Sequence, residues 1–386
     1  MVVSDRIRRI GMYTGGFIGP FGGGMVIVLV PEFRDAFGIS AALAALTITA
    51  YMIPYALLQL VSGTLGERYG QDRLLGGAFL VYAAGALACA AVSSIVPFLI
   101  ARVIQGSANA FTSPLALARL AAATPEESMG KAMGTWNSVQ TSAIVMAPVL
   151  GGLAGAYDYR LAFVMAAAVS LLLAVIVPAP GAERKRNPDP PRLRSALTPK
   201  VGWLGVSIFM FVMCTLGLAV IVSLKAADEF GVGAGGRGLL IAGFGLAGVI
   251  AGRPAGLLVD RVGVRAVSLA SIALAAAGVL MIAFASSTAA LAAFWLLAGL
   301  AASATFTTLN TLIIGASTEN RGGAISIIGS FRFAGAALSS IAWVAVYHAD
   351  ERLAFVSAAA GCALTSLTVL KAMNARATGR AAMPGA

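Results

Sequence analysis

The pentapeptide RLAFV occurs twice in this chain, at residues 160–164 and at residues 352–356, an offset of 192 residues. A second motif repeats at nearly the same offset. Residues 63–70 (GTLGERYG) have the pattern Gly-x-x-x-acid-Arg-x-Gly, and residues 256–263 (GLLVDRVG) repeat it 193 positions later. Two unrelated motifs that share one offset in a chain of 386 residues predict a duplicated unit, each copy of which fills half the chain.

The composition is that of a membrane protein. Hydrophobic residues make up 59% of the chain and charged residues only 11%, whereas about 25% of residues are charged in a typical soluble domain. The runs 74–92, 161–177 and 267–285 contain no charged side chain. Each is close to the length of about 20 residues that a helix needs to cross the hydrocarbon core. The sequence therefore predicts a polytopic, all-α membrane protein.

We expect twelve helical spans, grouped as two pseudo-symmetric six-helix halves. The predicted halves are residues 1–180 and 201–374, joined by a basic, proline-containing linker at residues 181–200 and followed by a tail at residues 375–386. The spans are expected to start near residues 10, 42, 74, 97, 132, 161, 201, 238, 266, 289, 323 and 353.

The distribution of positive charge predicts the orientation. If the N-terminus is cytoplasmic, most of the 27 Lys and Arg residues fall in cytoplasmic segments, as the positive-inside rule requires. We therefore expect an integral protein of the plasma (cytoplasmic, or inner) membrane with both termini and the linker in the cytoplasm. The formal net charge of +11 then follows from topology and contact with anionic lipid rather than from binding of nucleic acid.

The repeated loop motif combines glycines with adjacent acidic and basic side chains. Glycine permits tight turns and close helix approach, and an acid and a base can pair in one conformation and separate in another. The residues expected to form this gate are Gly63, Glu67, Arg68, Gly70 and Arg73 in the first copy and Gly256, Asp260, Arg261, Gly263 and Arg265 in the second. The motif resembles the loop signature of the major facilitator superfamily, which implies the major facilitator fold. The first copy departs from that signature at Glu67, Gln71 and Asp72.

The fourth predicted span contains Arg102, Gln105 and Asn109 at helical spacing, so that they share one face. The segment resembles the fourth-helix motif of the superfamily, and the resemblance implies that Arg102 and Gln105 take part in proton coupling. An arginine within a span must face protein or a watery cavity rather than lipid. Alternatively, Arg102 only ties helices together through backbone carbonyl groups.

The fifth predicted span contains Pro148, Gly151 and Gly152. Proline kinks a helix by removing a backbone donor, and paired glycines permit close packing. The segment resembles the fifth-helix motif of the twelve-helix drug:proton antiporters, with alanine at two positions where glycine is usual. The resemblance implies export rather than uptake.

The predicted spans contain basic but no acidic side chains near their centres. Many drug:proton antiporters of this superfamily carry a membrane-embedded acid in the first or second span, and residues 14–25 contain none. Arg332 lies near the predicted centre of span eleven, where an unpaired charge is costly and therefore points to function. Arg102 and Arg332 would suit an organic anion, so a facilitator or exchanger of organic anions is the alternative function. Arg332 could instead satisfy kinked backbone or pair with Glu32 or Asp158.

The cavity helices of the superfamily imply a substrate pocket lined by side chains from both halves. The residues expected there are Tyr55, Gln59, Asn109, Asn137, Gln140 and Thr141 from the first half and Phe209, Met213, Phe306, Asn310, Arg332 and Phe333 from the second. For each aromatic or methionine side chain, helix packing or contact with lipid is the other interpretation.

These motifs predict a secondary active transporter that works by alternating access, with proton-coupled efflux of small organic compounds such as drugs or metabolites as its function. The expected partners are the organic substrate, protons and membrane lipid, and the expected state is a monomer. The chain contains no GxxxxGK[ST] nucleotide-binding loop, and its one histidine is His348. We therefore predict that it is not an enzyme and needs neither a cofactor nor a metal.

Overall fold

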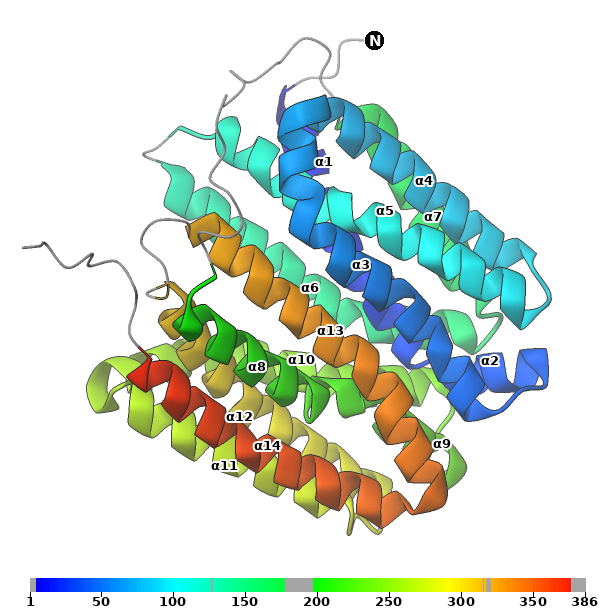
Figure 1. The fold of residues 1–386 in the computed structure, drawn as a ribbon. Helices are drawn as coiled ribbons and strands as arrows, with labels where there is room; N and C mark the ends of the chain where they lie inside the picture. Colours follow the sequence, from blue (N-terminus) through cyan, green and yellow to red (C-terminus); the bar gives the residue numbers. More distant parts are fainter. Residues whose placement is uncertain (1–4, 126–127, 178–196, 315, 317–320, 376–386) are drawn as a thin grey trace, which may run out of the picture. The chain divides into compact units, whose positions relative to one another are not determined.

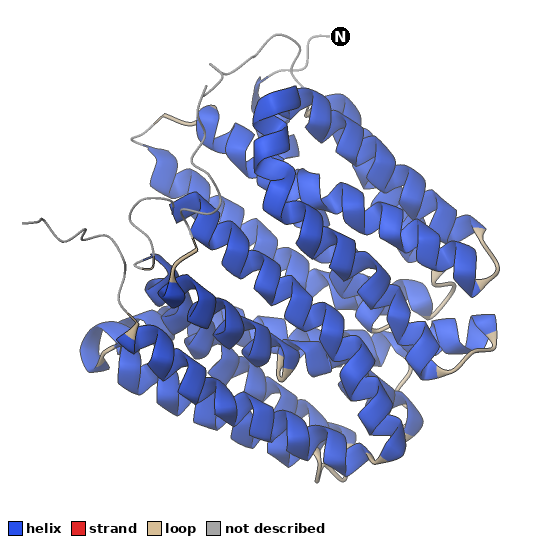
Figure 2. Ribbon diagram, in the orientation of Figure 1, coloured by secondary structure: helices blue, strands red, loops and turns tan. Residues whose placement is uncertain are grey.

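The computed structural model of this protein describes residues 5–125, 128–177, 197–314, 316 and 321–375. Among these residues every regular element is a helix, as Figure 2 shows. The first helices are α1 (Asp5–Ile27), α2 (Val30–Phe37), α3 (Ala41–Tyr69), α4 (Gln71–Ala91), α5 (Ile95–Ala122), α6 (Met129–Gly155) and α7 (Arg160–Ile176). They are followed by α8 (Pro199–Met213), the short 3-10 helix η3 (Leu216–Leu218), α9 (Ala219–Asp228), α10 (Ala234–Val262), α11 (Val264–Ile282), α12 (Thr288–Ile314), α13 (Arg321–Ala349) and α14 (Glu351–Asn374).

The described helices account for the predicted membrane spans. Ten segments are long and apolar enough to cross a membrane, and one of them joins α8, η3 and α9 into a single span, Pro199–Asp228. Helices α1 and α2 pass the same test as a pair, and α7 is an apolar helix of 17 residues. Together these segments correspond to the twelve predicted spans, so the predicted all-α polytopic architecture is confirmed.

The first span is broken, which the sequence analysis did not predict. Helices α1 and α2 are bent by 58° at a short break. Pro31 lies in the first turn of α2, where its missing N–H costs no helical hydrogen bond. Val28 and Leu29 form the break and are fully buried, so their backbone polar groups need partners inside the protein.

The helices form two compact units. The first contains Met1–Pro188 and Ala219–Gly245, and the second contains Asp189–Leu218 and Leu246–Ala386. Helix α9 and the first part of α10 thus belong to the unit built from α1 to α7. The boundaries predicted at residues 180, 200 and 374 stay a prediction, and most of the predicted linker and tail lie outside the described residues.

In the first unit, α5 packs against α3 and α4, α4 against α7, and α1 against α6 (Figure 1). Phe33 of α2 packs among the rings of Phe98, Tyr159 and Phe163, with centroid distances of 5.1, 5.2 and 6.3 Å. Aromatic pairs at such distances add to the stability that burial provides. This cluster fixes the position of α2 beyond the break.

In the second unit, α11 packs against α12 and α14, and α8 packs against α13 and α14. Trp295 of α12 is fully buried. The indole Nε1–H of Trp343 on α13 donates a hydrogen bond of 2.8 Å to the carbonyl oxygen of Met213. This contact satisfies a backbone carbonyl at the end of α8, where the helix leaves its last carbonyl groups without helical partners.

The duplication is visible in the backbone. Among the described residues, the backbone angle φ is positive at Gly38, Gly70, Gly231 and Gly263, with values of 63°, 93°, 62° and 92°. These glycines form two pairs, 38 with 231 and 70 with 263, and each pair is separated by 193 residues. Side chains other than glycine rarely adopt such angles. The same turns therefore occur at equivalent points of the two sequence repeats.

Candidate functional site

The repeated loop motif forms the same turn in both copies. The N–H of Gly70 donates to the carbonyl of Gly66 at 3.1 Å, and that of Gly263 donates to the carbonyl of Val259 at 2.9 Å. Each glycine ends one helix and allows the next to begin in the following residue. Among the described residues, no atom of another helix lies within 4 Å of a Cβ added at Gly63 or Gly256. The glycines that the motif needs for its tight turns are Gly70 and Gly263, where φ is positive.

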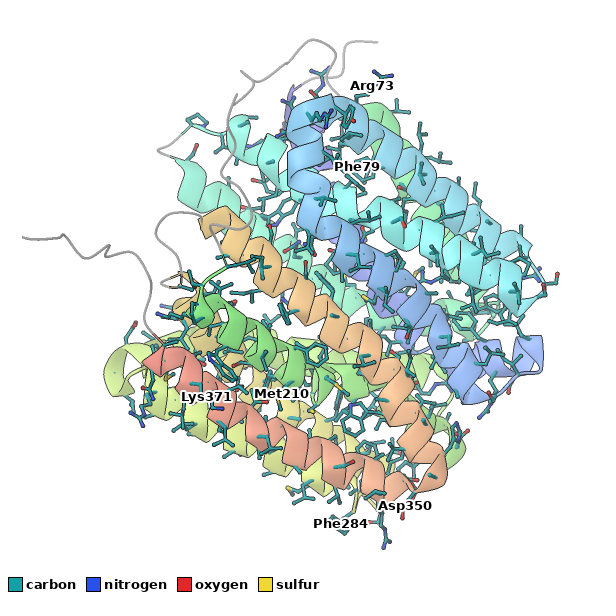
Figure 3. All side chains as sticks on the ribbon, in the orientation of Figure 1. Arg73, Phe79, Met210, Phe284, Asp350 and Lys371 are labelled. Atoms are coloured by element: carbon teal, nitrogen blue, oxygen red, sulfur yellow. The ribbon has the colours of Figure 1, made fainter. Side chains whose placement is uncertain are left out.

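The charged side chains of the motif lie at the surface of their units. Arg68, Asp260, Arg261 and Arg265 are exposed. Arg73 is also exposed at the start of α4 (Figure 3), and the side chain of Glu67 is outside the described set. Pairing of these acids and bases as a gate stays a prediction.

An ion pair that the sequence analysis missed stabilises the first copy. A carboxylate oxygen of Asp72, in the first turn of α4, lies 2.8 Å from Nε of Arg119, near the end of α5. Asp72 occupies a position at which the superfamily signature has a basic residue. An acid in the first turn of a helix and a base in the last turn both complement the helix dipole. The pair therefore joins α4 and α5 beside the motif.

Arg102 of α5 is fully buried within the first unit. Its Nε donates to the carbonyl of Thr47 on α3 at 3.0 Å, and both terminal nitrogens lie 3.5 Å from the carbonyl of Gly22 on α1. Nη1 also donates to the amide oxygen of Gln105. The guanidinium carbon lies 4.2 Å from the centre of the Tyr51 ring, a favourable cation–π distance. The charge is thus held by carbonyl groups, one amide and an aromatic face.

Polar side chains continue from Arg102 along α5. Nδ2 of Asn109 donates to the carbonyl of Gly19 on α1 at 3.3 Å, and the hydroxyl of Thr112 donates to Oδ1 of Asn109 at 2.7 Å. Arg102, Gln105 and Asn109 therefore share one buried face of α5 that is directed at α1. The structure brings these predicted residues together, and their role in coupling stays a prediction.

The hydroxyl of Tyr82 on α4 lies close to α1 in the same buried region. A methyl group at Gly22 would meet the hydroxyl oxygen of Tyr82 at 1.9 Å and that of Tyr51 at 3.0 Å. Neither tyrosine was predicted, because an aromatic side chain in a span gives no sequence signal of its distance from another helix.

We expect Gly22→Ala to lower Tm, since the added methyl group forces Tyr82 or α1 to move, and such overpacking costs about 1–3 kcal/mol. Tyr82→Phe removes the oxygen in the collision. The double variant should therefore recover at least half of the lost stability, as measured by thermal unfolding in detergent. A double variant no more stable than Gly22→Ala would show that this contact does not limit the packing of α1.

The glycine pair of α6 lies at two close helix crossings. A Cβ at Gly151 would lie 2.5 Å from the carbonyl oxygen of Met25 on α1, and a Cβ at Gly152 would lie 2.4 Å from that of Ala234 on α10. From the other side, a Cβ at Gly238 would lie 2.4 Å from the carbonyl oxygen of Pro148. Only glycine permits backbones to approach so closely. The predicted antiporter motif is thus the segment through which α6 contacts both α1 and α10.

The residues predicted for the substrate pocket differ in exposure. In the first unit Tyr55 is buried against Tyr51, with a ring distance of 6.2 Å. Gln59, Gln140 and Thr141 are half-buried, and the side chain of Asn137 is outside the described set.

In the second unit the guanidinium carbon of Arg332 lies 5.1 Å from the ring centre of Phe306. Both side chains are half-buried, as are those of Phe209, Met213 and Phe333. Asn310 is exposed. The structure thus brings Arg332 and Phe306 together.

Two ion pairs join α2 to α9 and α10, and the sequence analysis did not predict them. Nη1 of Arg34 lies 2.9 Å from a carboxylate oxygen of Asp228, and Arg237 pairs with Glu32. Glu32 was one of the partners predicted for Arg332; in the structure Glu32 pairs with Arg237. The partners are about 200 residues apart, and no local pattern links such distant residues.

Comparisons with known proteins agree with this architecture. The family model for the Major Facilitator Superfamily matches residues 12–225 and 204–383. The multidrug resistance protein B homolog of Mycobacterium tuberculosis is 33% identical over 157 residues, which cover 40% of this chain and 29% of that protein. Multidrug resistance protein 1 of Bacillus subtilis is 23% identical over 249 residues, 62% of this chain and 63% of that protein. The chain thus matches less than two thirds of the length of these relatives.

A solved structure has the same fold over nearly the full length. It is a bacterial homologue of the human lysosomal transporter Spinster in an inward-facing, occupied conformation, with a TM-score of 0.78. The identity is 14%, over 97% of this chain and 98% of that one, so this likeness concerns the fold alone. Because the family model covers both sequence repeats, the chain belongs to the Major Facilitator Superfamily, a family of membrane transporters rather than enzymes.

Proposed function

We propose that this protein exports small organic compounds, such as drugs or metabolites, in exchange for protons by alternating access. Two six-helix halves that rock about a central site need no covalent chemistry, only a difference in how tightly each conformation holds substrate and proton. The names of the relatives from M. tuberculosis and B. subtilis refer to multidrug resistance, which favours export of drugs over exchange of organic anions.

The observation that carries the proposal is the position of the α6 motif. The segment that resembles the antiporter signature contacts α1 through Gly151 and α10 through Gly152. Helix α6 belongs to the first sequence repeat and α10 to the second. In the proposed cycle these two helices would separate in one conformation and come together again in the other, and the motif lies at their contact. Crossings made through glycine can close tightly without interdigitated side chains.

The proposed topology follows the positive-inside rule. Both termini and the linker lie in the cytoplasm, and the protein is a monomer in the plasma membrane, surrounded by lipid. With this orientation, α2, α9 and the start of α10 lie at the external side, and the repeated loop motifs lie at the cytoplasmic side. Arg102 and Gln105 contribute to proton coupling from the buried face of α5, and Phe306 contacts the substrate, with Arg332 held against its ring.

We expect neutral or cationic lipophilic compounds to raise the Tm of the purified protein. At a ligand concentration 100 times Kd, binding to the folded state is worth about 2.7 kcal/mol, which shifts Tm by several degrees. The response to these compounds should be the same in Arg332→Gln and in Arg253→Gln, a control at an exposed arginine of the same unit. Stabilisation by organic anions alone, lost in Arg332→Gln and kept in Arg253→Gln, would overturn drug export and identify an organic-anion carrier.

A further inference from the structure

Glu32 and Arg237 form the most buried of the ion pairs between different helices of the described residues. The side chains are 20% and 5% exposed, compared with 31% and 37% for Arg34 and Asp228. Taking two charges out of water is costly, and removal of either charge strongly alters the remaining one. A change in the charge of Glu32 therefore has a larger effect here than a change at an exposed pair.

Arg237 lies at the break between α1 and α2. Its Nη2 lies 3.4 Å from the carbonyl oxygen of Val28, within the break, and its Nη1 donates to the carbonyl of Val232 at 2.9 Å. The third contact of the guanidinium is Glu32 in the first turn of α2. One side chain of α10 therefore binds the end of α1 and the start of α2 across the bend.

The contact between Glu32 and Arg237 uses one carboxylate oxygen. Oε1 accepts from Nη2, whereas Oε2 of Glu32 and Nε of Arg237 are buried and have no hydrogen-bond partner in the part of the chain that the structure describes. Arginine and carboxylate groups can pair through two parallel bonds, and this pair does not. One buried oxygen is thus free to take a proton while the other still contacts Arg237.

In the part of the chain that the structure describes, Arg237 is the one cation paired with the carboxylate of Glu32. The carboxyl carbon would lie 3.7 Å from a Cβ added at Gly155 of α6, and residues 144–155 of α6, 19–27 of α1 and 41–55 of α3 contain no charged side chain. The charged groups of the neighbouring segments are Arg34 and Asp35 on α2, Lys225 and Asp228 on α9, Glu229 just after it, Asp158 before α7 and Arg160 at its start. Arg34 is engaged by Asp35 and Asp228, Lys225 by Glu229, and Asp158 accepts the N–H of Arg160.

We propose that Glu32 is a proton-binding site and that its protonation releases α2 from α10. The proton binds to the carboxylate, which becomes a neutral carboxylic acid, and the attraction to Arg237 loses its charge–charge component. Arg237 keeps its bond to the carbonyl of Val232 in its own segment, and its only other contact across the bend is the longer one to the carbonyl of Val28. The start of α10 therefore moves away from α2, while α2 stays packed on α5 and α7 through Phe33. Among the described residues, the exposed pair of Arg34 and Asp228 is then the ion pair that still joins α2 to α9, and it is weak, because exposed ion pairs contribute little to stability.

This inference rests on the proposed function, since it supplies a carboxylate for the proton of the exchange. Under the proposed topology Glu32 faces the external side, from which protons would enter. Protonation at that side would favour separation of α2 from α10 and so opening toward the outside. Residues 14–25 contain no acidic side chain. In this proposal Glu32, on the short helix α2 beyond the break, provides the carboxylate instead.

The test is a distance measurement between spin labels on α2 and α10. Ala36→Cys and Leu239→Cys place labels at exposed positions of these two helices, and the native cysteines are buried. A labelled sample without the added cysteines measures the background. Distances are recorded in lipid nanodiscs between about pH 5 and about pH 8.5, a range in which buried carboxyl groups titrate. We expect a short distance at high pH and a growing longer population as the pH falls.

Three variants identify the group that titrates. Glu32→Gln and Arg237→Gln should both show the longer population at every pH. Asp228→Asn removes a carboxylate from the exposed pair and should keep the wild-type response to pH. Glu32→Asp, which keeps the acid, should also keep a response. A wild-type distribution that does not change with pH, or a Glu32→Gln protein that responds like wild type, would overturn the inference.

Transport by the same wild-type protein in proteoliposomes separates this inference from the proposed function. Transport driven by a pH gradient, together with distances that do not depend on Glu32, would overturn the proton site and leave the exporter intact. Distances that respond to pH through Glu32, without any transport driven by a pH gradient, would support the site and overturn proton-coupled export.

Discussion

Replacing Gly106 with alanine is expected to lower Tm by about 5 °C or more, and replacing it with leucine is expected to prevent folding. A Cβ at Gly106 on α5 would lie 2.1 Å from the carbonyl oxygen of Tyr51 on α3 and 2.8 Å from the carbonyl carbon. These atoms belong to the backbone of a buried helix and cannot rotate away. The two helices would have to separate where Arg102 contacts Thr47 and Tyr51.

The matched control is Gly77→Ala on α4. Gly77 is also in a helix, but it is exposed and an added Cβ would meet nothing within 4 Å. Alanine is favoured over glycine in a helix by about 0.5–1 kcal/mol, so this variant should equal or exceed the wild type in Tm. Thermal unfolding of both variants in the same detergent checks the prediction. Equal Tm values for Gly106→Ala and the wild type would contradict the close contact of α3 and α5.

Arg102→Met is expected to fold but to transport substrate at least about tenfold more slowly than the wild type. This change corresponds to an increase of about 1.4 kcal/mol in the activation free energy of transport. The carbonyl groups of Gly22 and Thr47 lie within helices, where each can also accept its helical hydrogen bond. Removing the guanidinium therefore does not leave them unpaired. A hydrophobic side chain of similar size can replace a buried charge with little or no loss of stability. The proposed role of Arg102 in transport would account for the cost of burying this charge.

Arg102→Lys is the control for that prediction. Lysine keeps the charge but cannot donate in several fixed directions in the plane of a guanidinium, so it should lose contacts to Gly22, Thr47 or Gln105 and be less stable than Arg102→Met. Transport rates and Tm are measured on the same preparations. Wild-type transport by Arg102→Met would contradict the proposed coupling role and leave Arg102 with the task of joining helices.

Much of the fold could be predicted because its signals are local or periodic. Uncharged runs of span length marked the helices, and the common offset of the repeated motifs marked the duplication, which recurs in the positive φ angles of Gly70 and Gly263. The paired glycines of α6 could be assigned to close packing from the sequence alone. Such features depend on the chain near each residue or on the membrane as solvent.

The rest depends on contacts between distant segments. The break between α1 and α2 leaves an apolar run that looks continuous in sequence, and its stabilising contacts come from the aromatic cluster around Phe33 and from Arg237. No sequence pattern around Glu32 indicates that Arg237 is its partner. The pairing of Asp72 with Arg119 could not be predicted either. The departure of Asp72 from the superfamily signature does not indicate which residue Asp72 contacts.

The most direct test of the proposed exchange is transport by the purified protein in liposomes with a pH gradient imposed in either direction. Permanently charged organic cations, neutral compounds and organic anions are supplied as substrates, and liposomes without protein measure passive movement. Permanently charged cations avoid the trapping of weak bases in acidic compartments. A proton exchanger should accumulate its substrate on the acidic side and reverse that accumulation when the gradient is reversed. Equilibration to equal concentrations whatever the direction of the gradient would contradict proton-coupled export and indicate a facilitator.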